Sequence, residues 1–446
     1  MLTFAYDTID FSDDRRRARA LPNGRMPPGR FGAGWLLRLC LLQPERLSFE
    51  RTETVLQSGR PFVYPLELTR ASLAGFLTGP LTLASDVPPA VLEAARRGRA
   101  VILVWLGDTV APLDLDAAGT IWLFDYVRHF MVEHELPGRA VWLVTGTVTA
   151  FEAFDDWLKG RWLFVPEAPQ LHAMTVFPTF AQATYHANRR GWDVSVAHDP
   201  VYGVVTLATV PVAADTPRAH LVDDADRAAE QAGAALRRWR FSCLNDGTEP
   251  HRQIVISYLQ ASGYLDDCLA RFGAAPIDLN DGCGFAVPGA EPLQETLRRG
   301  WLALHPKLPL ELAGDAPHRD SYVAIASADS FDGLPCVDDR LLSPILDRQP
   351  FLWVGPPDSL RYLRSLGFKT FGRVIDERYD ANDRFGARMM RVLGQIEGLA
   401  RRPKAALRDL YFECLPEIEH NHAHLVEGRH QLDVMLRTLE IRLGTS

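Results

Sequence analysis

The sequence predicts an α/β fold, in which two units of alternating strands and helices are followed by a helical tail. Short, nearly continuous apolar runs alternate with amphipathic segments over residues 100–180, and again from Trp239 onward. This pattern is typical of parallel sheets covered on both faces. Apolar residues recur at helical spacing after Asn382, which indicates the tail. A chain of 446 residues suits two or three domains. The predicted bounds are 1–235, 236–380 and 381–446.

In the first unit the apolar runs at 100–106 and 140–145 predict strands, and residues 119–134 between them predict a helix. A short helix ending at Gly160 and a strand at 162–165 follow. The alternation therefore continues through at least three strands, as a parallel sheet requires.

Residues 190–213 are rich in β-forming residues and are interrupted by Asp199-Pro200, so they predict a hairpin or an antiparallel edge. The next segment, 214–238, turns polar and alanine-rich. We expect it to form a helical connection to the second unit, which begins with a strand at 240–245.

A helix is predicted to follow that strand, with Pro250 in its first turn, Thr248 as its cap and Gly263 at its end. Further on, residues 335–372 predict a helix, a buried strand, a tight turn, a second helix and a last strand. The buried strand is Phe351–Val354. We expect Asp358 or Ser359 to cap the helix after it, and Gly367 to end that helix.

Composition narrows the classes of function. A net charge of −8 argues against a nucleic-acid-binding protein. Neither a signal peptide nor a run of 18 apolar residues is present, and the six cysteines are widely spaced, without a CxxC pair. We therefore expect a cytoplasmic protein with reduced thiols and no membrane span. The oligomeric state and the role of residues 1–60 stay open.

Two stretches of the second unit carry a family resemblance. The segments Gln349-Pro350-Phe351 and 363–371 (LRSLGFKTF), together with Cys243-Leu244-Asn245 and Pro250-His251-Arg252, resemble those of phage and bacterial glycosyltransferase-like proteins. The same arrangement is similar to the nucleotide-sugar domain of α-1,3-fucosyltransferases. Where this group has Thr-Glu-Lys, the chain has Asp338-Asp339-Arg340, which keeps the order of acid and base. The resemblance implies a GT-B-like chain with two Rossmann-like domains.

The resemblance also implies a nucleotide-sugar donor (a GDP-, UDP- or CMP-sugar) bound without a required metal. Arginines and helix N-termini would then stabilise the charge that grows on the departing phosphate. Asn245, His251 and Arg252 lie between a strand end and a helix start, a position that favours phosphate. From the residues alone, Arg252 could instead pair with Glu249 or Asp266.

Further donor contacts are predicted at Arg340, Asp338 and Asp339, which would bind phosphate and the hydroxyls of ribose or sugar. The two acids could equally cap a helix. Lys369 could face the cleft. Asp329 follows the predicted strand at 321–327. In fucosyltransferase-like domains, an acidic residue near this position binds the nucleotide sugar, so the resemblance implies the same role for Asp329.

An inverting transfer needs a general base to activate the acceptor hydroxyl. Asp108, at the end of the strand at 100–106, is the preferred candidate. Glu167 is a second candidate, and Glu152 is explained as well by a capping box starting at Thr149. The acceptor, a hydroxyl on a glycan, a protein or a small molecule, would therefore meet the first unit near Asp108.

Other polar segments are interpreted as structural. His420, His422 and His424 suggest a metal by composition, but a polar tail segment explains them better, and no metal site is predicted. Asp376 and Glu377 are interpreted as caps of the tail helix. Phosphate loops of the GxGxxG and GxxxxGK[ST] types and a GxSxG elbow are absent from the sequence. The sequence thus predicts a glycosyltransferase, with a non-catalytic relative that binds a nucleotide sugar, a glycan or a partner as the alternative.

Overall fold

The structure is a computed structural model. It describes residues 2–6, 46–67, 87–106, 123–145, 154–155, 157–159, 170–173, 192–198, 205–211, 236–245, 249–272, 291–304, 320–328, 330–333, 335–427 and 432–444. The chain forms two compact units. Unit 1 consists of Met1–Ala213 with Arg429–Ser446, and unit 2 consists of Ala214–Gly428.

Unit 1 contains a six-stranded sheet with the order β2-β1-β3-β4-β5-β6. Each pair of neighbouring strands in this sheet is parallel. The strands are β1 (Leu2–Tyr6), β2 (Leu47–Arg51), β3 (Phe62–Glu67), β4 (Ala100–Leu106), β5 (Val141–Thr145) and β6 (Gln170–Ala173). The predicted strands at 100–106 and 140–145 are thus confirmed, while the one predicted at 162–165 lies outside the described residues.

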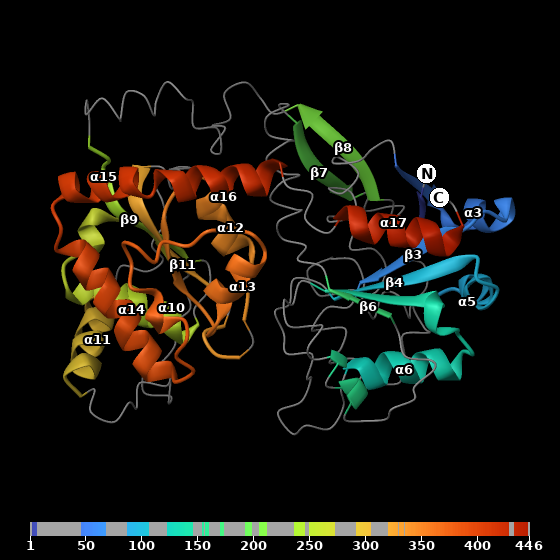
Figure 1. Ribbon diagram of the computed structural model, residues 1–446, viewed down its shortest axis with the longest axis horizontal. Helices are drawn as coiled ribbons and strands as arrows, with labels where there is room; N and C mark the ends of the chain where they lie inside the picture. The colour runs from blue at the N-terminus through green and yellow to red at the C-terminus, as the bar shows by residue number, and fades with distance from the viewer. Residues whose placement is uncertain are drawn as a thin grey trace. The chain divides into compact units, whose positions relative to one another are not determined.

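Alternate strand residues of this sheet face two apolar clusters, as the pleat of a strand requires. On one face, Ile102 and Leu143 pack with three helices, α3 (Thr52–Ser58), α5 (Pro89–Arg96) and α6 (Leu123–Glu133). On the other face, Leu103 and Trp142 pack with the last helix of the chain, α17 (Leu432–Leu443). The sheet is therefore covered on both sides, and one cover comes from the far end of the sequence (Figure 1).

Strands β7 (Trp192–His198) and β8 (Val205–Pro211) form a separate antiparallel pair with Trp192 opposite Pro211. This confirms the antiparallel pairing predicted for residues 190–213. Of the predicted helical connection at 214–238, only 236–238 is described, and this part is not helical.

Unit 2 contains a four-stranded parallel sheet with the order β10-β9-β11-β12. Its strands are β9 (Trp239–Asn245), β10 (Cys268–Phe272), β11 (Ser321–Ser327) and β12 (Phe351–Val354). After β9 the chain moves outward to β10, and it then returns to place β11 on the other side of β9. The strand order therefore reverses between β9 and β11, which is where open parallel sheets bind ligands.

Helices cover both faces of the second sheet (Figure 1). Helix α10 (Pro250–Ala261) contacts α11 (Glu291–Leu304) and α14 (Phe385–Ala400), whereas α12 (Asp339–Leu346) contacts α16 (Leu415–Glu427), which also touches α15 (Lys404–Glu413). A short helix, α13 (Ser359–Ser365), follows β12. The predicted fold class, α/β with two Rossmann-like domains and a helical C-terminal part, is confirmed by these sheets and helices.

Local details differ from the expectations. The N-cap of α10 is Glu249, not Thr248, and that of α13 is Asp358, whose side chain does not cap. Residues 368–372 form no strand, because side chains from other segments take their backbone groups. The predicted helical tail is divided between the units: α14–α16 belong to unit 2 and α17 to unit 1. The domain bounds themselves stay a prediction.

Candidate functional site

The candidate site is the carboxyl edge of the second sheet, where the strand order reverses. The ends of β9 and β11 lie side by side there, because Ala324 of β11 pairs with Ser242 of β9 in a parallel register. Helix α10 leaves the end of β9, and α12 begins twelve positions after β11. Both helices therefore direct their N-terminal turns toward the same edge.

Arg252 is fully buried at this edge. Its Nη2 and Nε donate to the carbonyl oxygen of Ala328 at 2.7 and 3.1 Å. Its Nη1 lies 2.8 Å from Oε2 of Glu249. The guanidinium thus joins the start of α10 to the end of β11. Of the two partners that the sequence offered as the alternative to phosphate, Glu249 is the one in contact.

His251 supports the same point. Its Nε2 lies 2.9 Å from the carbonyl oxygen of Ala328, so the proton on Nε2 is donated there. The imidazole is buried and stacks on Phe331, with ring centroids 5.6 Å apart and planes 20° apart. Two neighbouring basic side chains of one helix therefore hold a single carbonyl beyond the end of β11.

A second buried arginine, Arg388 of α14, holds the continuation of this loop. Its Nη2 donates to the carbonyl oxygen of Phe331 and, at 2.8 Å, to Oδ1 of Asp332. Its Nη1 donates to the carbonyl oxygen of Asn382 at 2.5 Å. The guanidinium carbon lies 4.1 Å from the centroid of the Phe331 ring, within cation–π range. Burial lowers the pKa of Arg388, although Asp332 opposes this shift.

At the start of α12, Asp338 is the N-cap residue, and its Oδ1 accepts from the backbone N–H of Leu341 at 3.1 Å. Its other oxygen lies 3.9 Å from Nη1 of Arg340. Asp338 is buried, whereas the side chain of Arg340 is 27% exposed. Capping, one of the two roles considered for Asp338, is therefore present, and Arg340 keeps a surface that a ligand can reach.

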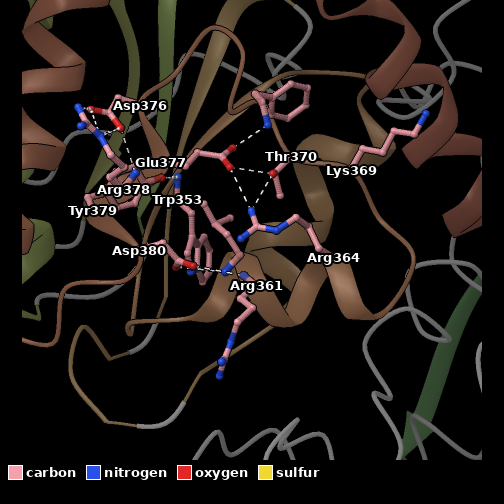
Figure 2. A network of polar contacts seen from close by, with 12 residues as sticks. Trp353, Arg361, Arg364, Lys369, Thr370, Asp376, Glu377, Arg378, Tyr379 and Asp380 are labelled. Carbon is pink, nitrogen blue, oxygen red and sulfur yellow. Dashed lines mark hydrogen bonds and ion pairs between the residues drawn. The ribbon is translucent and has the colours of Figure 1, made fainter.

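The N-terminus of α13 is closed by an acid of the same chain. The carboxylate of Asp380 accepts from the backbone N–H groups of Leu360 and Arg361 (Figure 2). The carbonyl oxygen of Asp380 accepts from the N–H of Asp358 at 2.7 Å. Burial raises the pKa of Asp380, and the two N–H donors oppose this shift. The carboxylate of Asp380 therefore satisfies two of the N–H groups at the start of α13.

Glu377 binds the segment that was predicted to be a strand. Its Oε1 accepts from the N–H of Phe371 at 2.6 Å, and its Oε2 accepts from Thr370 at 2.7 Å and from Arg364 at 3.1 Å (Figure 2). Burial raises its pKa, and these donors lower it. The interpretation of Asp376 and Glu377 as caps of the tail helix is wrong, since Arg384 is the N-cap of α14 and no side chain caps it.

Lys369 lies beside this network, with its side chain exposed and directed away from Glu377 (Figure 2). Its backbone is held on both sides by Asn421, which accepts from the Lys369 N–H at 2.7 Å and donates to its carbonyl at 2.8 Å. These two bonds satisfy backbone groups without a strand partner, which explains why residues 368–372 form no strand.

The histidine segment is helical, within α16. Nε2 of His420 lies 2.9 Å from the carbonyl oxygen of Gly367, and Nε2 of His424 lies 2.8 Å from that of Leu366. Their spacing of four residues places both on one helix face, where they contact the carbonyls of the two residues that follow α13. Within the part of the chain that the structure describes, no cluster of His, Cys, Asp and Glu is suited to a metal ion.

Several predicted site residues cannot be placed. Asp108 and Asp329 lie outside the described residues, as do Glu152 and Glu167. Asn245 ends β9 and Asp339 begins α12, but only their backbones are described. The structure gathers His251 and Arg252 at the end of β11. It does not bring Lys369 into contact with them.

The sequence analysis missed Arg388 and Asn421, and it gave Asp380 no role of its own. A signal for Arg388 was present, because it occupies the apolar face of α14 beside Met389 and Val392, where a charged residue needs a buried partner. No comparable pattern marks Asp380 or Asn421, since their partners are backbone groups far along the chain.

No helix among the described residues is long and apolar enough to cross a membrane. No family model matches the chain, and no curated protein does. Among solved structures, an α,α-trehalose-phosphate synthase (UDP-forming) from Burkholderia vietnamiensis shares 13% identity at a TM-score of 0.40, covering 97% of this chain and 86% of its own.

An α,α-trehalose 6-phosphate synthase from Burkholderia multivorans shares 12% identity at the same TM-score, covering 93% and 81%. At this identity and TM-score, neither structure indicates what this chain binds or transfers.

Proposed function

We propose that the protein is a GT-B-like glycosyltransferase that moves a sugar from a nucleotide-sugar donor to a hydroxyl acceptor. The observation that carries the proposal is the reversal of strand order between β9 and β11, with Arg252, His251 and Arg340 at its carboxyl edge. A diphosphate needs positive charge and helix N-termini, and this edge offers both. The sequence resemblance, at Pro250–Arg252 and 363–371, supports the same donor class.

In this proposal the two units have different tasks. Unit 2 binds the GDP-, UDP- or CMP-sugar, with Asn245, Asp329, Asp338, Asp339 and Lys369 as further proposed contacts. The acceptor meets unit 1, and Asp108 removes its proton. No metal is required, because arginine and backbone N–H groups supply the charge compensation. We further propose a cytoplasmic location and no nucleic-acid partner.

Arg340 is the group best suited to touch the leaving phosphate directly. It combines a partly exposed guanidinium with a place in the first turn of α12, and its Nη1 lies 3.9 Å from Oδ2 of Asp338. Arg252 has no exposed surface and is bound by Ala328 and Glu249. Arg252 therefore supports the site by holding the Ala328 carbonyl. It would contact a phosphate directly only if the ligand displaced Glu249.

A second candidate function is favoured by two observations. Arg252 is bound by Ala328 and Glu249, and Asp338 caps α12. A non-catalytic relative would keep the fold and a binding edge while its former phosphate-binding side chains serve structure. Such a protein would bind a nucleotide sugar, a glycan or a partner without turnover. Fold alone does not separate the two candidates.

The first experiment is a thermal-shift screen with GDP, UDP, CMP, dTDP and their common sugars, with and without Mg²⁺ or Mn²⁺. A ligand at about 100 times its Kd should stabilise the protein by about 2.7 kcal/mol. One nucleotide family that raises Tm, followed by product formation with an acceptor panel, supports the transferase. Binding without turnover supports the second candidate. A folded protein whose Tm responds to no nucleotide contradicts both donor-binding functions.

A further inference from the structure

We propose that Arg388 is a positioning residue for the donor site: it fixes the described part of the loop after β11, Ala328 and residues 330–333, in the shape that receives the nucleotide. This inference deepens the proposed function and rests on it. The loop leaves the carboxyl end of β11, at the reversal of strand order where the donor is expected. What holds this loop therefore decides the shape of the site.

Basic side chains from two helices hold the loop. Arg252 and His251 of α10 bind the carbonyl of Ala328 at its start. Arg388 of α14 binds the carbonyl of Phe331 and the carboxylate of Asp332 further along. A loop whose carbonyls are used by its own protein presents its remaining groups in one arrangement, and this is the preorganisation that a binding site needs.

The two anchors are also linked through Phe331. One side of its ring stacks on His251, and the Arg388 guanidinium lies over the ring, 4.1 Å from its centroid. Phe385, at the start of α14, meets the same ring edge-on at 4.8 Å. Loss of Arg388 would therefore release Phe331 and Asp332 while leaving the Ala328 end fixed.

Arg388 is buried and donates to the backbone carbonyls of Phe331 and Asn382, so removing its guanidinium would cost stability as well as position. Its partner Asp332 has a side chain that is 59% exposed. An ion pair reaching from the core to an exposed loop carboxylate orients the loop more than it stabilises the fold.

The test uses Arg388→Met, which keeps length and apolar contact with Phe331 and Phe385, and Asp332→Asn, which removes the ion pair from the exposed side without emptying the core. Arg391→Met is the matched control, because Arg391 is an exposed residue one turn further along the same helix. Two readouts are measured on the full-length protein: amide hydrogen exchange of residues 328–333 without ligand, and the Kd of the nucleotide that the thermal-shift screen identifies.

We expect both variants to speed exchange in the loop and to weaken nucleotide binding at least tenfold, while Arg391→Met changes neither. Arg388→Met should also lower Tm, because two backbone carbonyls lose their donor, whereas Asp332→Asn should keep Tm near that of the wild type. Unchanged exchange in both variants would overturn the anchoring role. Faster exchange with unchanged Kd would overturn positioning of the donor. If the wild-type protein binds none of the nucleotides, the proposed function fails and the donor role of Arg388 fails with it, even where the exchange data show the anchor.

Discussion

The carboxylate of Asp380 accepts a hydrogen bond from the backbone N–H of Leu360 at 3.1 Å, twenty residues earlier in the chain. The same carboxylate accepts from the N–H of Arg361 at 3.2 Å. The residue at the N-cap position, Asp358, has a left-handed backbone with φ of 61° and makes no side-chain cap. Helix α13 is thus capped by a distant acid.

Replacing this distant cap should cost stability. We expect Asp380→Ala to lower the free energy of unfolding by about 1–2 kcal/mol, because the buried N–H of Leu360 and the partly buried N–H of Arg361 lose their acceptor. Asp380→Asn keeps one carbonyl oxygen and should cost less. Urea unfolding monitors both. Asp376→Asn serves as control, since Asp376 pairs with a fully exposed Arg378, and a cost there as large as that of Asp380→Ala would refute the distant cap.

The wild type and Asp380→Asn should also differ in how their stability depends on pH. Burial raises the folded-state pKa of Asp380, so the folded protein binds this proton more tightly than the unfolded chain does. The contribution to stability is therefore fully present below the unfolded pKa and is lost as pH rises through the folded pKa. Relative to Asp380→Asn, the wild type should gain stability as pH falls through the folded-state pKa toward the unfolded value of about 4. Denaturant titrations at several pH values measure the free energy of unfolding of both proteins. If the stability of the wild type relative to Asp380→Asn increased with rising pH, this would contradict the prediction.

Arg252 offers a test between structure and phosphate binding. Arg252→Met leaves the Ala328 carbonyl without its arginine donors, so we expect the free energy of unfolding to fall by about 1–3 kcal/mol. A direct phosphate clamp would instead lose about 10²–10³ in turnover at unchanged Tm. Differential scanning fluorimetry and activity, measured together, separate these results. The exposed Arg298→Met, whose partner is Glu295, is the control.

Arg340→Met should behave in the opposite way. Its side chain is 27% exposed and lies 3.9 Å from Asp338, a long ion pair, so we expect Arg340→Met to cost less stability than Arg252→Met does. In a donor-binding protein we expect Tm without ligand to stay within about a degree, while the nucleotide-induced rise in Tm is largely lost. Arg361→Met, an exposed change on α13, should keep the full response. An unchanged response in Arg340→Met would remove this residue from the donor site.

Gly367 should not tolerate a side chain. Its φ is +93°, and an added Cβ would lie 2.8 Å from Nε2 of His424. We expect Gly367→Ala to lower the free energy of unfolding by about 1–3 kcal/mol, from backbone strain and from loss of the contact between α13 and α16. Gly394→Ala is the matched control, because it lies inside α14 with nothing within 4 Å of an added Cβ, and it should be neutral or stabilising. Equal effects would contradict the account of Gly367.

Local patterns predicted the strands and helices around the site well. The apolar run Phe351–Val354 became β12, and the helix started by Pro250 became α10, because burial and first-turn proline act within a few residues. The roles of Asp380, Glu377 and Asn421 do not follow from local patterns. Each residue binds backbone groups six to fifty-two residues away in sequence, and a local pattern carries no record of such partners.

The candidate site likewise combines features that local sequence predicts with features that depend on distant partners. Arg252 and Arg340 stand at helix starts that the sequence located, but whether a guanidinium faces solvent or a carbonyl depends on packing between α10 and the end of β11. Arg388 shows that a charge on an apolar helix face is itself a signal. The histidines of α16 met backbone carbonyls instead of a metal, because their spacing matched the end of α13.

Helix α17 gives the protein a fixed order of assembly. Met435, Leu436 and Leu439 complete the apolar layer over Leu2 and Phe4 in the first strand, yet they follow all of unit 2 in the chain. During synthesis, which runs from the N-terminus, unit 2 has its whole sequence before unit 1 does. The strands of the first sheet are synthesised earliest, and one apolar face of this sheet stays uncovered until α17 has been synthesised. During that time, this face is exposed to association with other nascent chains.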